Sequence, residues 1–288
     1  MSNSVAIVTG ASQGIGRATA IRLARDFSAL VLVAGNRAHL EETAEAAKTA
    51  GADALVIDVD LGLPSAARTV VEQALGAFAR IDALLNIAGA VPQIDLFEMT
   101  DEQWEAGMAL KLHGARRLTI AAWPALKAVK GSVVLMSGNS ALFPKAPYAA
   151  VGTVNAAIVA LAKAFSDRGI ADNVQVNSVL PGPVTTGRRR SYLQHWAPLH
   201  NMTVEEATAN FPKEAGIARY GAPEEIAELD GLPGVAGRTL DDRLHAPHGR
   251  WRSEVGLTAE TVFRTVGPVR CPSLLQGLRE GMGGPFPK

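Results

Sequence analysis

The sequence predicts an α/β domain built on a doubly wound parallel sheet, and two observations carry that prediction. Short apolar runs alternate with longer amphipathic stretches over about the first 180 residues, and a glycine-rich turn separates the first run from the first amphipathic stretch. Such regular alternation favours parallel strands with helices on both faces. At 288 residues, 48% of them hydrophobic, the chain suffices for a single domain of this kind with an appendage.

The expected strands are short and rich in β-branched residues. They lie near 4–9, 29–34, 53–57, 82–86, 131–136 and 174–179. The helical patterns lie near 14–25, 38–50, 64–79, 101–128 and 154–168. Ligands of such sheets bind beyond the carboxyl ends of the strands. The residues that follow the strands are therefore expected to line one common edge.

The turn after the first strand reads Thr9-Gly10-Ala11-Ser12-Gln13-Gly14-Ile15-Gly16. Backbone N–H groups at the start of the following helix, together with the helix dipole, can hold a pyrophosphate. A purely structural turn is the alternative. The turn predicts a dinucleotide site.

The spacing Thr-Gly-x-x-x-Gly-x-Gly resembles that of the short-chain dehydrogenase/reductase family, and other segments extend this resemblance in order over residues 4–229. Asp58-Val59 resembles the step that contacts adenine, Asn86-Ile87-Ala88-Gly89 resembles the family's Asn-Asn-Ala-Gly, and 177–184 resembles the segment that reaches nicotinamide. The resemblance implies a Rossmann-like NAD(P)-binding domain over 1–229. The implied cofactor contacts are Gly10, Ser12, Gln13, Gly14, Ile15, Gly16, Arg37, Asp58, Val59, Asn86, Ala88, Gly89, Pro181, Gly182 and Val184.

The type of nicotinamide cofactor depends on the end of the second strand. A carboxylate there favours NAD, and a basic group favours NADP. Gly35 supplies neither charge, whereas Arg37 either reaches a 2′-phosphate or stays solvated. Gln13 stands where many NADP-dependent relatives carry a basic residue in the glycine turn. On balance Arg37 favours NADP.

The positions that carry the family's chemistry depart from its pattern. The resemblance implies a Tyr, a Lys four residues later, a Ser from the preceding strand end and an Asn from the fourth helix. The stretch 155–164 resembles the segment that begins at that Lys, so Asn155 takes the Lys position and Val151 the Tyr position. In the same register Gly138 takes the Ser position and Lys111 the Asn position.

Val151 cannot transfer a proton, so two rearrangements stay open. Lys111 would project its ammonium toward the place where the family's Lys is missing, or Ser137, Ser140 or Tyr148 would supply a hydroxyl. The structural alternatives are a surface lysine, a packing tyrosine and a serine bonded to backbone. Three functions follow: an NAD(P)-dependent oxidoreductase acting on a carbonyl or hydroxyl compound, an inactive NAD(P)-binding sensor or partner subunit, and a non-redox isomerase or lyase. Fold alone cannot choose among them.

A long insertion, residues 183–222, stands where the family covers its substrate. It contains three consecutive arginines, 188–190, several aromatic residues and the amphipathic run Thr203 to Phe211. Thr203 and Glu206 form the pattern of a helix-capping box. The mixture predicts a medium-sized, partly apolar substrate. The arginines either bind an acidic group of substrate or cofactor or form a solvated loop.

Composition indicates neither nucleic acid nor membrane as a partner. Lys plus Arg and Asp plus Glu each number 28. We find no signal-peptide pattern, and no run that approaches the ~20 apolar residues of a membrane span. A lone cysteine, Cys271, fits a reducing, cytoplasmic location. We expect no metal site, because the spacing of His245 and His248 is incidental. The resemblance implies a homo-oligomer, which the unusual C-terminus puts in doubt.

The tail, residues 230–288, is rich in glycine, proline and arginine and no longer resembles the family. It is expected to be disordered, divergent or frameshifted. The segment 242–252 can be encoded so that reading one base later gives TGSTLRMDGG, which resembles the family's ending. A frameshift would remove the last strand and leave its neighbour's edge unpaired. Gene sequencing tests this hypothesis, and an unbroken frame with incompatible codons excludes it.

Overall fold

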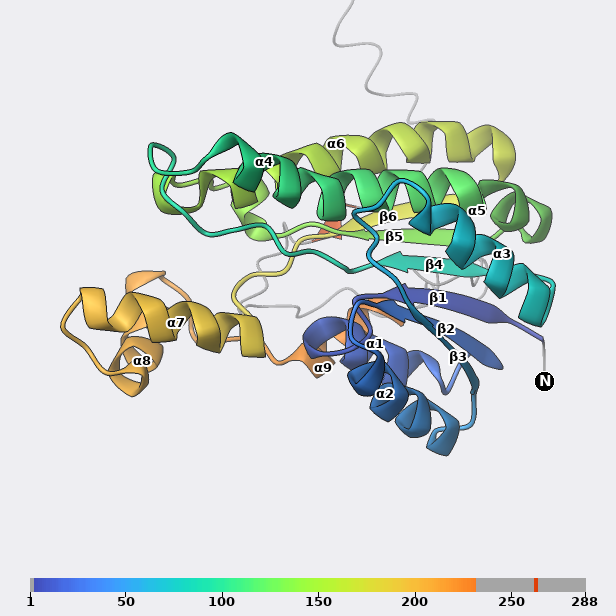
Figure 1. Cartoon of the computed structure of the whole chain (residues 1–288), viewed down its shortest axis with the longest axis horizontal. Coiled ribbons are helices and arrows are strands. Elements are labelled where there is room, and N and C mark those ends of the chain that lie inside the picture. The colour runs from blue at the N-terminus through green and yellow to red at the C-terminus, as the bar shows by residue number, and fades with distance from the viewer. Residues whose placement is uncertain (1–2, 232–261, 264–288) are drawn as a thin grey trace, which may run out of the picture.

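The computed structural model describes residues 3–231 and 262–263, and it confirms the predicted doubly wound sheet (Figure 1). The strand order is β3-β2-β1-β4-β5-β6-β7. Strands β1 to β6 are parallel to one another, and all six were predicted. Their bounds are β1 Val5–Thr9, β2 Ala29–Ala34, β3 Asp53–Asp58, β4 Ala83–Asn86, β5 Ser132–Met136 and β6 Gln175–Val179.

The helices cover both faces of the sheet. One face carries α3 Ala66–Phe78, α4 Asp101–Met108, α5 Ala115–Val129 and α6 Ala149–Asp172. The other carries α1 Gly14–Leu23, α2 Arg37–Thr49 and α9 Pro223–Asp230. Helices α7 Gly187–Leu199 and α8 Val204–Glu214 project from one end as a separate lobe, here called the α7–α8 lobe. The turn at residues 146–148 is a 3-10 helix.

Two hydrophobic layers form the core, one on each face of the sheet. In β1, Val5 and Ile7 pack toward α3, α5 and α6, whereas Ala6 and Val8 pack toward α1 and α2. Because both faces are buried, β1, β2 and β5 read as nearly continuous apolar runs, whereas the edge strand β3 is only partly buried. This burial explains why sequence alone located them.

Helix positions differ from expectation in four places, one of which is α9, which was not predicted as a helix. The helix expected over 101–128 contains a π-helical segment, η1 Ala109–Gly114, between α4 and α5. Such segments are frequent at functional sites. Helix α6 begins at Ala149 rather than near 154, and α7 was not predicted as a helix. The capping box of Thr203 and Glu206 at the start of α8 is confirmed.

One segment in the described part of the chain, Ala146–Asp172, is long and apolar enough to cross a membrane by length and composition. Our sequence expectation of no such run overlooked it. In the fold this segment packs along β6, and its buried residues join the core, as the central helix of a globular domain does. Its composition is therefore weak evidence for a membrane.

A short seventh strand pairs with β6, the strand whose edge was expected to be unpaired. Strand β7 Val262–Phe263 pairs antiparallel with Ser178 and Val179 of β6. That end of β6 is therefore paired over two residues, and the origin of the tail stays a prediction. The rest of the tail, with Cys271, His245 and His248, lies outside the described residues.

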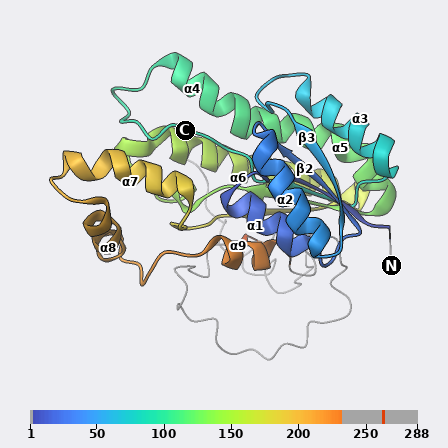
Figure 2. The same ribbon diagram turned by 60° about the horizontal axis from the view of Figure 1, so that its bottom comes forward.

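Helix α9 lies against α1 (Figure 2) and carries Asp230 at its C-terminal end. Asp230 is fully buried, and one of its oxygens accepts a 2.8 Å hydrogen bond from the Thr19 hydroxyl. The other oxygen finds no partner within the described chain. Burial raises the pKa of Asp230 to about 7, against the smaller opposing effect of Thr19. Ionised Asp230 thus destabilises the native state.

The substitution Asp230→Asn is expected to stabilise the protein at alkaline pH. Between pH about 4 and about 7 the native carboxyl holds a proton that the unfolded chain releases, so wild-type stability falls as pH rises through this window. Asparagine preserves the shape and removes that charge. Urea unfolding at pH 8 should show a gain on the order of 2–4 kcal/mol, since one pKa unit is about 1.4 kcal/mol.

At pH 4 the same comparison should give nearly equal stabilities. The control is Glu228→Gln, which alters an exposed carboxylate two residues before Asp230 on α9. A difference between Asp230→Asn and wild type that does not change with pH would contradict the ionisation argument.

Candidate active site

A cavity of about 970 Å³ opens at the carboxyl ends of the parallel strands. The glycine turn and the loops after β4, β5 and β6 line it, and the α7–α8 lobe closes one side. Its volume is at the upper end for small-molecule sites. The expectation that the strand-end residues share one edge is confirmed for most of these segments.

The glycine turn is shaped by close backbone contacts. Gly10 has a φ of +68°, and a Cβ there would lie 3.0 Å from the backbone of Ala88. A Cβ on Gly16 would lie 2.1 Å from the carbonyl oxygen of Gly10. Helix α1 starts within this turn, and no side chain caps its first N–H groups. These donors line the cavity and suit an anionic ligand.

Most residues implied as cofactor contacts meet in this cavity. The lining includes Gly10, Ser12, Gln13, Gly14, Ile15, Gly16, Val59, Ala88, Gly89, Pro181, Gly182 and Val184. Arg37, Asp58 and Asn86 are not among them. Arg37 donates to Asp58 at 3.0 Å and to Glu41 at 2.9 Å, so its guanidinium turns toward carboxylates. Asn86 is buried and donates to the Thr119 hydroxyl at 3.1 Å.

Two cavity-lining residues were not among the predicted cofactor contacts. Asp60, two residues beyond Asp58, lines the cavity, and so does Gly35 at the end of β2. Asp58 ends β3 and pairs with Arg37, whereas the next acidic residue, Asp60, lines the cavity. The sequence pattern does not distinguish Asp58 from Asp60. The path of the backbone after β3 decides which of them lines the cavity.

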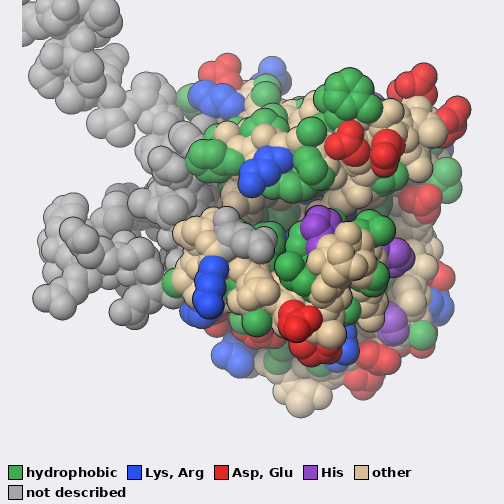
Figure 3. Space-filling view, turned by 90° about the vertical axis from the view of Figure 1, so that its left-hand side faces the viewer, with side chains coloured by type: hydrophobic (Ala, Val, Ile, Leu, Met, Phe, Trp, Pro, Cys, Tyr) green, Lys and Arg blue, Asp and Glu red, His purple; other side chains and the backbone are tan. Residues whose placement is uncertain are grey.

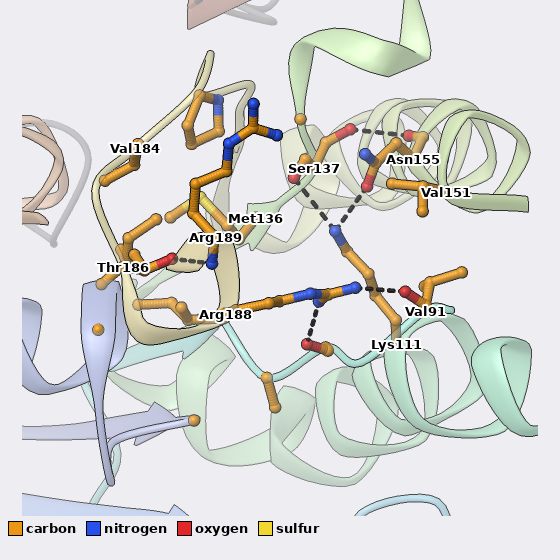
Figure 4. Close-up of a pocket in the computed structure, with 18 of the residues that line it drawn as sticks. Val91, Lys111, Met136, Ser137, Val151, Asn155, Val184, Thr186, Arg188 and Arg189 are labelled. Carbon is orange, nitrogen blue, oxygen red and sulfur yellow. Dashed lines mark hydrogen bonds between the residues drawn. The ribbon is translucent and has the colours of Figure 1, made fainter. Parts of the chain in front are cut away.

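Lys111 and Asn155 meet at one wall of the cavity (Figure 4). The Lys111 ammonium donates to the Asn155 side-chain oxygen at 2.5 Å and to the Ser137 carbonyl oxygen at 3.1 Å. Asn155 in turn donates through its side-chain nitrogen to the Ser140 hydroxyl at 2.8 Å. The structure thus brings together the two residues that our sequence register predicts in the family's Asn and Lys positions.

Two glycines leave room for this pair. A Cβ on Gly138 would lie 2.6 Å from the side-chain nitrogen of Asn155, and one on Gly89 would lie 2.9 Å from Cδ of Lys111. A larger residue at 138 would displace Asn155 from its present place. The departures at 111, 138 and 155 are therefore packed as one unit.

The electrostatics around Lys111 favour loss of its proton near neutral pH. Burial, and to a smaller extent the charge of Arg188, lower the pKa of Lys111 to about 7. Arg188 donates to the Gly89 carbonyl at 2.8 Å and also to the Val91 carbonyl, and burial lowers its own pKa. No carboxylate pairs with either cation in the described part of the chain. This wall of the cavity is accordingly suited to negative charge.

The other candidate proton donors differ in availability. Ser137 is buried, and its hydroxyl donates to the Asn155 carbonyl at 2.8 Å, the backbone-bonded alternative considered for it. Tyr148 lines the cavity from the 3-10 turn, and its hydroxyl makes no hydrogen bond to the described residues. Val151 lines the cavity too and offers only methyl groups. Among residues 3–231 and 262–263 no cluster of His, Cys, Asp or Glu is suited to a metal ion.

Comparison with known proteins identifies the family. The profile of the short-chain dehydrogenase family matches residues 4–196. This chain belongs to that family. It is 30% identical over 224 residues to the short-chain reductase protein NovJ of Streptomyces niveus, covering 78% of this chain and 84% of the relative. It is 32% identical over 228 residues to a putative ketoacyl reductase of granaticin polyketide synthase from Streptomyces violaceoruber, covering 78% and 86%.

Solved structures of family members share this architecture. L-sorbose reductase from Gluconobacter frateurii, complexed with NADPH and L-sorbose, aligns with a TM-score of 0.74 at 28% identity, covering 80% of this chain and 88% of the other. Actinorhodin polyketide ketoreductase with NADPH aligns with a TM-score of 0.77 at 26% identity, covering 82% and 93%.

Proposed function

We propose that this protein is an NADP(H)-dependent oxidoreductase that interconverts a carbonyl and a hydroxyl group on a small molecule. Membership in the short-chain dehydrogenase family supports the reaction class. The glycine turn fits a dinucleotide, because the first N–H groups of α1 carry no side-chain cap and lie at the cavity, where they suit a pyrophosphate. When bound, the nicotinamide supplies or accepts the hydride.

The preference for NADP remains part of the proposal. Gly35 lines the cavity at the end of β2, where a carboxylate would favour NAD. The relatives L-sorbose reductase and actinorhodin ketoreductase have both been solved with NADPH. Arg37 would have to leave Glu41 and Asp58 to reach a 2′-phosphate, and all three side chains are exposed enough to move.

We assign proton transfer to Lys111, and its hydrogen bonds to Asn155 and Ser137 carry this assignment. An ammonium has three N–H groups, so one remains for a substrate oxygen. With a pKa of about 7, Lys111 can donate its proton to a carbonyl oxygen near neutral pH. Asn155 holds the ammonium in place, and the charge of Arg188 favours the negative charge that develops on that oxygen.

A catalytically inactive NADP-binding protein is the second candidate. Val151 in the position of the family's tyrosine and the backbone-bonded Ser137 hydroxyl favour it. No comparable observation favours a non-redox isomerase or lyase. A cytoplasmic location and a homo-oligomeric state remain predictions, the first from the single cysteine and the second from the family.

The test is a titration of the full-length protein with NADPH and NADH, followed by fluorescence, and then a screen of carbonyl compounds for NADPH oxidation. We expect tighter binding of NADPH than of NADH, and turnover of at least one carbonyl class. Binding without turnover would favour the inactive protein. Absence of binding by either nucleotide would overturn both candidates.

A further inference from the structure

We infer that the substrate carries an anionic group, a carboxylate or a phosphate, which Arg189 binds at the lobe end of the cavity. This inference deepens the proposed function and rests on it. It starts from an arginine whose surroundings differ from those of the other cations in the site.

Arg189 lies among aromatic rings contributed by three segments. Its guanidinium carbon is 3.8 Å from the ring centre of Phe211 in α8, 5.0 Å from that of Tyr192 in α7 and 5.6 Å from that of Tyr220. Phe211 and Tyr220 also stack on each other, with ring centres 5.6 Å apart. The rings fix the plane of the guanidinium by cation–π contact and supply no hydrogen-bond acceptor to its edge.

Two nitrogens of this guanidinium lack partners. Nε and Nη2 of Arg189 are buried and have no acceptor within the described chain, and the Tyr220 hydroxyl is also buried and has no partner there. Buried donors without acceptors cost free energy. Arg188, the preceding residue, gives its N–H groups to two backbone carbonyls instead. Arg189 is thus held ready for an acceptor that the described chain does not provide.

The arginine faces the same cavity as Lys111. Arg189, Tyr192 and Phe211 all line it, and hydrophobic side chains make up much of this end of the molecule (Figure 3). Among the described lining residues, Lys111, Lys145, Arg188 and Arg189 are cationic and only Asp60 is acidic. Asp60 belongs to the segment after β3, so no carboxylate of the α7–α8 lobe lines this end.

These facts define the class of substrate. A guanidinium binds carboxylate or phosphate through paired hydrogen bonds. With the reacting carbonyl at Lys111, the anionic group extends toward Arg189, and the aromatic rings contact the carbon chain between them. The substrate is therefore an oxo acid, a hydroxy acid or a phosphorylated ketone.

The experiment compares anionic compounds with neutral partners of matched length. The probes are 3-oxobutanoate, 4-oxopentanoate, 5-oxohexanoate and 6-oxoheptanoate with their methyl esters, and dihydroxyacetone phosphate with dihydroxyacetone. Binding is measured by calorimetry with and without NADP+, and kcat/KM is measured with NADPH. We expect at least one anion to bind about tenfold tighter than its neutral partner. Comparison of the oxo acids with dihydroxyacetone phosphate shows whether the site prefers a carboxylate or a phosphate.

Arg189→Met should remove the preference for the anion and leave NADPH affinity unchanged. Arg189→Lys, which keeps the charge but not the planar fork, should retain part of it and serves if the methionine variant fails to fold. The matched control is Arg190→Met, since Arg190 is exposed and does not line this cavity.

Equal binding of anions and neutral partners by the wild type would overturn the inference. So would an equal loss of NADPH and anion affinity in Arg189→Met, which would assign the arginine to the cofactor. Calorimetry without nucleotide measures anion binding directly. A failure of the anion inference can therefore be told apart from a failure of the proposed oxidoreductase function.

Discussion

Lys111→Met is expected to lower kcat for carbonyl reduction by about 10²–10⁴-fold, the range typical of removing a general acid. The substitution removes the ammonium that Asn155 and the Ser137 carbonyl hold in the cavity. NADPH affinity should change little, because the glycine turn lies on other strand ends. Stopped-flow or steady-state kinetics with the best carbonyl compound, together with a fluorescence titration of NADPH, measure the two effects separately.

The pH profile provides a second measurement of the same role. Since the acid form of Lys111 donates the proton, the wild-type rate of reduction should fall as pH rises through about 7. The residual rate of Lys111→Met should lack this fall. The reverse reaction should show the opposite dependence in the wild type, because it needs the neutral amine.

Lys163→Met is the control, because Lys163 is an exposed lysine on α6 that does not line the cavity. Full activity in Lys111→Met would exclude the lysine as proton donor. Tyr148→Phe would then be the next variant, since the Tyr148 phenol lines the same cavity without a hydrogen bond to the described residues.

Gly16→Ala is expected to abolish detectable NADPH binding and to lower the free energy of unfolding by about 2–4 kcal/mol. The new methyl group would lie 2.1 Å from the Gly10 carbonyl oxygen, a backbone atom that cannot turn aside. The start of α1 would have to move away from β1, and its N–H groups would lose their place in the cavity. Urea unfolding and nucleotide titration of the purified variant measure both effects.

Gly76→Ala is the matched control for the glycine turn. Gly76 lies in α3, and nothing is within 4 Å of the position its Cβ would take. Alanine favours a helix over glycine by about 1 kcal/mol, so this variant should be slightly more stable and bind NADPH normally. Unchanged nucleotide affinity in Gly16→Ala would show that the turn does not hold the dinucleotide.

Prediction from the sequence worked where a residue's environment is set by its near neighbours in the chain. The strands are buried on both faces, so their apolar runs stand out, and the capping box at Thr203 depends on contacts three residues apart. Helix α7 was missed because arginines fill its first turn and no regular apolar stripe follows. Its one clear signal is Thr186, which accepts a hydrogen bond from the Arg189 N–H as an N-cap.

Contacts between distant segments decided the details of the site. Register against the family placed Lys111 and Asn155 in exchanged positions, but their 2.5 Å hydrogen bond joins residues 44 apart in the chain. Asp60 lines the cavity and Asp58 does not, and this too depends on how distant segments pack. Side-chain direction at a strand end depends on the loop that follows, which no local pattern fixes.

The amino-acid order alone was sufficient for the parallel sheet and the glycine turn, and it predicts the departure of four positions from the family's chemistry. These features follow from periodicity, backbone freedom and residue identity, which are local properties. Folding in three dimensions determined that Lys111 meets Asn155 and that Arg37 turns to carboxylates. It also determined that Arg189 lies among Phe211, Tyr192 and Tyr220, with two nitrogens that have no acceptor among the described residues. Hydrogen bonds and burial between remote side chains depend on how helices and loops pack, and packing is a property of the whole chain.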